Sequence, residues 1–170
     1  MTKRRSGPMI AVAVVLLAVA ALAVVLTRFG PYDPIGFIDG SSYADTASIA
    51  RGKAGYETYC ASCHGKLLQG QPGWKNPLPN GRLPAPPHDA SGHTWHHPDA
   101  VLAGITRRGL KPYVSEDYES DMPAFGKVLT EQQINDILSY VKSTWPERER
   151  EYQAQMTVQT PKDPAAPAAK

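Results

Sequence analysis

The sequence predicts an all-α fold, and three observations lead to that prediction. The segment from Thr130 to Trp145 carries apolar residues at helical spacing behind a capping pattern. Nowhere does the chain show the convincing alternation of apolar and polar residues that half-buried strands require. Glycines and prolines fill long stretches between the helical segments. We therefore expect one helical domain of about 100 to 150 residues with irregular loops and short appendages.

The charge balance excludes one class of partner. The 170 residues carry a formal net charge of +2, which excludes a strongly basic nucleic-acid binder. Four of the basic residues flank the N-terminal apolar segment, and the rest of the chain is slightly acidic. We expect an ordinary soluble surface and no nucleic acid as a partner.

The N-terminal segment, residues 1–30, is predicted to anchor the chain in a membrane. Met9 to Leu26 is an unbroken run of 18 apolar residues, about long enough to cross a bilayer as a helix. Three basic residues precede the run and only Arg28 closely follows it, which leaves the N-terminus in the cytoplasm. A cleaved secretory signal is the alternative, because Ala21-Leu22-Ala23 offers a small-x-small site. Both interpretations export everything after residue 30.

The domain is predicted to begin with a helix from about Ala47 to Cys60. Residues 31–46 precede it and are rich in Pro, Gly, Ser and Asp, which is typical of a linker. Gly52 and Gly55 are poor helix formers in its interior, and they make sense only if another helix packs closely against them. The residues spaced along one face of this helix are Ile49, Gly52, Tyr56 and Tyr59.

The only two cysteines lie at the end of that helix, in the sequence Cys60-Ala-Ser-Cys63-His64. A structural zinc site needs four ligands, and a thioredoxin-like pair needs a surrounding βαβ pattern that is missing here. A disulfide would close a very short loop and constrain the unfolded chain little. Cys-x-x-Cys-His is instead the attachment signature of c-type haem. Cys60 and Cys63 would form the two thioethers, and His64 would be the proximal ligand of the iron.

A methionine is the best candidate for the sixth ligand of that iron. Met1 is the initiator, Met9 lies in the apolar run and Met156 lies near the C-terminus, which leaves Met122. Core packing is the alternative for a methionine, although Ser-Asp-Met-Pro is poor core material. Thioether ligation would raise the potential and suit electron transfer.

Residues 65–92 contain too many glycines and prolines for a regular element of any length. Their end overlaps the sequence HDASGHTWHHPD, for which three interpretations stay open. The histidines could form a second metal site for copper or zinc, or one could ligate the haem in place of Met122. They could also cap the next helix, bind haem propionates or face water. This sequence holds four of the five histidines of the chain: His88, His93, His96 and His97.

Two further helices are predicted beyond the histidines. A short one starts near Pro98, a favoured residue of the first turn, and ends before Gly109. A longer one runs from Thr130 to Trp145, and Pro146 is expected to stop it. For residues 147–170 we expect a frayed helix extension and a disordered Pro/Ala tail. The capping box of the longer helix is formed by Thr130 and Gln133, and its apolar stripe by Ile134, Ile137, Leu138, Val141 and Trp145.

Three segments resemble class I monohaem cytochromes c of the N-terminally membrane-anchored bacterial type. They are GKAGYETYCASCHG, DMPAFGKVLT and QQINDILSYVKSTWP, and the resemblance covers residues 47–146. It implies a cytochrome c fold, a small helical domain wrapped around one covalently bound haem c. It also implies that a proline carbonyl, of Pro86 or Pro87, accepts the Nδ1 hydrogen of the proximal histidine. In that family two residues of the first helix pack against two of the last, here Gly52 and Tyr56 against Ile137 and Tyr140.

The function expected from these features is electron transfer rather than catalysis. The chain would be a single-pass protein of a bacterial cytoplasmic membrane with its haem domain on the periplasmic side. The resemblance implies redox partners at the membrane, namely a quinol-oxidising complex, a terminal oxidase or a dehydrogenase. Two alternatives are a haem peroxidase or ligand-binding protein, which would need Met122 to leave the iron, and a copper-handling protein that uses the histidines.

Overall fold

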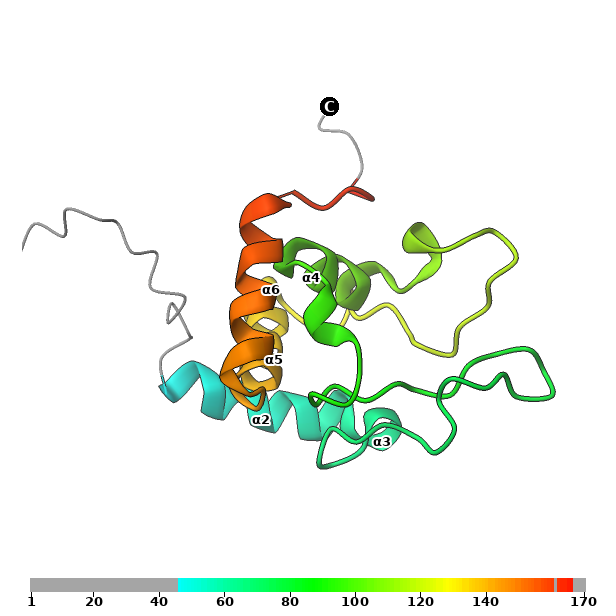
Figure 1. Ribbon diagram of the computed structural model, residues 1–170, viewed down its shortest axis with the longest axis horizontal. Helices are drawn as coiled ribbons and strands as arrows, with labels where there is room; N and C mark the ends of the chain where they lie inside the picture. The colour runs from blue at the N-terminus through cyan, green and yellow to red at the C-terminus, as the bar shows by residue number, and fades with distance from the viewer. Residues whose placement is uncertain (1–45, 161, 167–170) are drawn as a thin grey trace, which may run out of the picture. The chain divides into compact units, whose positions relative to one another are not determined.

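The computed structural model describes residues 46–160 and 162–166, and all regular elements in that part are helices (Figure 1). The prediction of an all-α fold is confirmed for these residues. The predicted N-terminal anchor and most of the linker lie outside the described residues. Among the helices that are described, none combines the length and the apolar character needed to cross a membrane.

The core forms where α2 (Thr46–Tyr59) packs against α5 (Glu131–Ser143). Tyr56 and Trp145 are the largest fully buried side chains of this core together with Ile134. A Cβ atom at Gly52 would lie 1.9 Å from the carbonyl oxygen of Asp136, so only glycine permits this approach of the two backbones. The close packing expected at Gly52 is confirmed, and Tyr56 lies against Tyr140 with ring centroids 5.5 Å apart.

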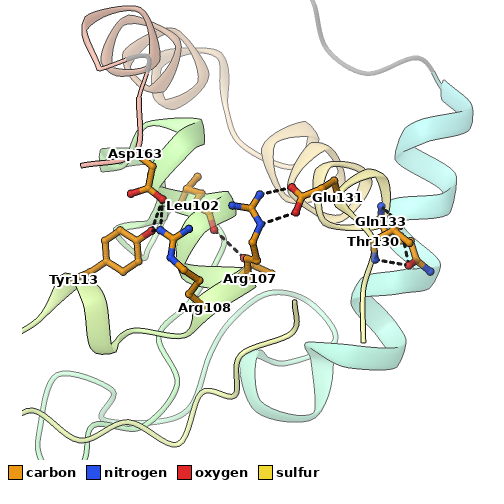
Figure 2. Close-up of polar contacts among 9 residues, drawn as sticks. Leu102, Arg107, Arg108, Tyr113, Thr130, Glu131, Gln133 and Asp163 are labelled. Atoms are coloured by element: carbon orange, nitrogen blue, oxygen red, sulfur yellow. Dashed lines mark hydrogen bonds and ion pairs between the residues drawn. The ribbon is translucent and has the colours of Figure 1, made fainter. Parts of the chain in front are cut away.

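The predicted capping box at the start of α5 is present (Figure 2). Thr130 Oγ1 accepts a hydrogen bond from the backbone N–H of Gln133, and the Gln133 side chain accepts one from Thr130 N–H at 2.9 Å. The pair satisfies two backbone donors that have no partner inside the helix. An N-cap of this kind contributes about 1 kcal/mol to stability.

A buried carboxylate ties the two core helices together. Asp136 of α5 accepts hydrogen bonds from Arg51 Nε at 2.7 Å, from Gln132 Nε2 at 2.9 Å and from Ser48 Oγ. The bond from Arg51 is the main reason why the pKa of Asp136 falls to about 2.

We expect Asp136→Asn to lower the free energy of unfolding near neutral pH by about 1.5 to 3 kcal/mol, because a hydrogen-bonded charge is lost. The pKa of Asp136 is lower in the folded than in the unfolded protein, so its contribution is present above pH 3.8 and is lost as the pH falls towards 2. Urea unfolding of both proteins across this pH range measures the effect. A wild type whose acid sensitivity matched that of the variant would contradict it.

Helix α4 (Asp99–Arg108) is braced against α5 by two ion pairs. Lys142 Nζ lies 2.8 Å from Asp99, and Arg107 binds Glu131 at the first turn of α5 (Figure 2). The predicted bounds of this helix are confirmed, but Pro98 is its N-cap with extended backbone rather than a residue of the first turn.

Residues beyond Pro146 form a separate helix, α6 (Glu147–Gln159), rather than the frayed extension that we expected. Pro146 has extended backbone and acts as the N-cap, so the chain changes direction before the helix restarts. The buried side chain of Gln153 donates hydrogen bonds to Asp99 Oδ1 at 2.7 Å and to the carbonyl of His97 at 3.2 Å. These polar contacts, with the edge-on packing of Tyr152 against Trp95 and His96, hold a helix that lacks an apolar stripe.

Part of the predicted disordered tail makes specific contacts. Asp163 binds Arg108, and Tyr113 donates a hydrogen bond to the same carboxylate at 2.6 Å (Figure 2). Tyr113 belongs to the short 3-10 helix η2 (Lys111–Tyr113), which follows α4. The C-terminal segment thus reaches back to the end of α4.

Candidate haem site

The two cysteines lie at a single helical turn, Cys60 directly before it and Cys63 within it. Cys60 precedes the short helix α3 (Ala61–His64), and its backbone still continues the hydrogen bonding of α2 through Tyr56. Residues three apart on a helix lie on the same face, so both sulfur atoms can reach one bound group. Both cysteines are free thiols rather than a disulfide, and Cys63 is exposed while Cys60 is half-buried.

His64 is buried, and its ring is held in one orientation. Its Nδ1 lies 2.8 Å from the carbonyl oxygen of Pro86. A carbonyl can only accept, so Nδ1 carries the hydrogen and Nε2 keeps a free lone pair. Burial lowers the pKa of His64, which favours the neutral ring that a metal needs. Of the two prolines expected for this role, the structure selects Pro86.

Two glycines let the long loop reach His64. Gly70 has a φ of +67°, and a Cβ there would lie 2.5 Å from the backbone nitrogen of Pro87. A Cβ at Gly92 would lie 2.1 Å from the carbonyl oxygen of the same proline. The loop also closes through a hydrogen bond from Gly70 N–H to the carbonyl of His64 at 2.7 Å. The backbone around Pro86 is therefore packed tightly against the histidine turn.

Met122 lies in the irregular segment that follows η2. It is half-buried and lines a cavity of about 270 Å³ with Arg108, Leu110 and Tyr118, among others. Cys60, Cys63 and His64 do not line this cavity. The structure thus brings the two cysteines and His64 together at α3 and its N-cap, and places Met122 at a separate cavity.

Arg82 connects the two long loops on which Pro86 and Met122 lie. Its guanidinium lies 2.7 Å from Glu119 and also binds Asp121, the residue before Met122. The far side of the Met122 loop is fixed to α4, because Phe125 N–H donates to the carbonyl of Thr106 at 2.9 Å. Arg82 could not be predicted from the sequence, because a surface arginine among loop residues belongs to no pattern that identifies its partner.

Three of the clustered histidines lie against aromatic side chains. His93 stacks on Trp74 and meets His97 edge-on, with both pairs of ring centroids 5.5 Å apart. His96 stacks on Trp95 at 3.7 Å, in the 3-10 helix η1 (Thr94–His96). Within the described residues, no group of three potential ligands is placed to hold a metal ion. The interpretation of these histidines as a second metal site is therefore not supported.

The fourth, His88, lies on one face of the His64 ring. Ligands on opposite sides of an iron point their ring nitrogens at each other with the metal between them. Two rings that stack face to face cannot do this, so His88 is excluded as the ligand opposite His64. The position of His88 near His64 could have been predicted from the sequence, because His88 comes only two residues after Pro86.

An all-helical domain in which one turn presents two free thiols and an imidazole oriented by a proline carbonyl is that of a c-type haem protein. Residues 49–145 match the family model described as Cytochrome c. The match covers more than half of the chain, so the chain belongs to the cytochrome c family. It carries covalently bound haem c, and Cys60 and Cys63 are the cysteines of its attachment motif. Members of this family are generally electron carriers rather than enzymes. Comparisons with curated proteins and with solved structures give no significant match.

Proposed function

We propose that this cytochrome c is a membrane-tethered electron carrier on the periplasmic side of a bacterial cytoplasmic membrane. The observation that carries the proposal is the hydrogen bond of 2.8 Å between His64 Nδ1 and Pro86, which leaves Nε2 of a buried ring for the iron. In this proposal Cys60 and Cys63 would hold the haem through thioethers, and His64 and Met122 would coordinate its iron. The bound haem supplies one-electron chemistry, because its iron alternates between Fe(II) and Fe(III).

Support for Met122 as the second ligand comes from the loop that carries it. Arg82 fixes this loop to the one that orients His64, and Thr106 fixes it to α4. A thioether on a restrained loop can occupy the sixth position in both oxidation states. Occupied positions on both sides of the iron keep other ligands away, which suits electron transfer rather than oxygen activation.

Met122→Leu tests this ligation, because leucine keeps the apolar volume and removes the sulfur. We expect the oxidised wild type to show the weak far-red absorption band of a methionine–Fe(III) bond, and the variant to lack it. The midpoint potential should fall by a fraction of the roughly 0.8 V over which axial ligands set haem potentials. The variant should also bind carbon monoxide readily. A band that persists in the variant, or a wild type that binds carbon monoxide tightly, would contradict the proposal.

The tether is proposed from the apolar run Met9 to Leu26 and the basic residues before it. Tethering would hold the haem domain at a high local concentration near membrane partners. By analogy with the family, these would be a quinol-oxidising complex, a terminal oxidase or a dehydrogenase.

We expect the full chain to stay with the membrane fraction after a high-salt wash and to need detergent for release. A variant with residues 1–30 replaced by a cleavable secretory signal should appear in the soluble periplasmic fraction with its haem attached. Haem staining of the separated fractions measures both outcomes, and proteins that co-purify with the detergent-solubilised full chain would identify the partners. A full chain that appears in the soluble fraction with its N-terminal segment removed would contradict the tether.

A further inference from the structure

His88 is half-buried, and its ring contacts the histidine of the haem motif. Its centroid lies 3.9 Å from that of His64, and the two ring planes differ by 22°, which is a face-to-face stack. On another side, Tyr56 meets His88 edge-on at 6.2 Å. Tyr56 is itself immobilised, because it is fully buried in the core and its hydroxyl donates a hydrogen bond to the carbonyl of Gly65 at 3.0 Å.

Hydrogen bonds to backbone and side chain restrict the position of His88. Its N–H donates to the carbonyl of Leu68 at 2.8 Å, and its own carbonyl accepts the indole hydrogen of Trp145 at 2.7 Å. The ring nitrogen Nδ1 lies 2.8 Å from Thr94 Oγ1. The Thr94 hydroxyl also lies 3.4 Å from the carbonyl oxygen of Pro87, so it is held between the His88 ring and the backbone of the same loop.

These contacts complement the hydrogen bond that orients His64. The bond from Nδ1 to Pro86 restrains one atom of the ring, but a carbonyl oxygen accepts over a broad range of directions, so this bond alone restrains the tilt of the ring plane only weakly. A flat group against the face of the ring removes that freedom. Second-shell partners of a metal-bound histidine are known to set ring orientation and ligand basicity.

We infer that His88 is a positioning residue for the axial ligand: its ring fixes the plane of the His64 imidazole, and Thr94 in turn fixes the ring of His88. This inference rests on the proposed ligation of the haem iron by His64. The plane of an axial imidazole sets the magnetic axes of oxidised low-spin haem, so spectra of the oxidised protein report on it directly.

The test compares two substitutions at this position in the holoprotein. His88→Phe keeps a flat ring, whereas His88→Leu keeps an apolar side chain without a flat face. We expect the haem methyl shifts in the NMR spectrum of oxidised His88→Phe to follow those of the wild type. In His88→Leu these shifts and the EPR g-values should change, and the midpoint potential should rise because the π face beside the ferric site is lost. His96→Leu is the matched control, since it removes a stacked histidine outside the haem motif and should leave all three measurements unchanged.

Wild-type shifts, g-values and potential in His88→Leu would overturn the inference, and so would equal changes in the phenylalanine and leucine variants. If His88→Leu fails to mature, Thr94→Val replaces it, because this change frees the His88 ring and leaves the stacked residue in place. Unchanged haem methyl shifts in Thr94→Val would then overturn the inference. Failure of the proposed function is a different result: the wild type itself would lack the optical spectrum of a six-coordinate low-spin haem.

Discussion

Gly52→Ala is expected to destabilise the folded protein by more than about 3 kcal/mol, the upper end of the range for ordinary overpacking. The new Cβ would lie 1.9 Å from Asp136 O and 2.5 Å from Asp136 C, which are backbone atoms of α5. Backbone atoms in a helix cannot move away individually, so α2 and α5 would have to separate. Alanine improves the helix propensity of α2 by about 1 kcal/mol, and this gain is too small to offset the clash.

The matched control is Gly55→Ala, which lies one turn further along the same helix. A Cβ at Gly55 would lie 2.8 Å from Ile137 Cγ1, so Gly55→Ala should also destabilise the protein, but by less, because one side chain can shift without moving the backbone of α5. Both variants gain the same helix propensity, so the difference between them isolates the approach of the two backbones. Urea unfolding of the holoproteins, followed by circular dichroism, measures that difference. Equal stabilities for the two variants would contradict the prediction.

Local sequence signals predicted much of the fold and of the histidine turn. The capping box of Thr130 and Gln133 acts within one helical turn, so its letters alone specify the contact. Cys60, Cys63 and His64 lie within five residues, and their relative placement follows once that segment is helical. A glycine in a helix is similarly informative, because it has few reasons to be there other than close packing.

Contacts between segments that are distant in the chain could not be predicted from the sequence. Arg82 and Glu119 are both surface residues of irregular loops, and no periodicity indicates that they meet. Helix α6 was expected only as a frayed extension for a related reason: its buried residue is the polar Gln153, which binds Asp99 rather than filling an apolar core. The periodicity of apolar residues predicts helices that have an apolar face, so it does not predict a helix without one.

Replacement of both cysteines by serine is expected to have the other large effect, which is loss of the covalent haem and of the folded loops. The protein core around α2 and α5 is small, and domains of this size bury little surface to spare. Each of the two long loops places one leucine in this core, Leu68 and Leu129, but their neighbours Leu67 and Val128 are 79% and 61% exposed. We expect a bound haem to cover such exposed apolar side chains, so its loss should remove part of the packing of these loops.

The expected result for Cys60→Ser with Cys63→Ser is a protein whose mass equals that of its polypeptide and whose thermal unfolding loses its cooperative transition. Ser62→Ala is the control, because it changes the exposed residue inside the same motif and leaves both sulfur atoms. It should keep the haem mass and the wild-type transition. Intact-protein mass spectrometry and circular dichroism separate two effects, attachment and folding. A double variant that unfolded cooperatively at the wild-type temperature would show that the helices fold without the haem, and that the loops do not depend on it.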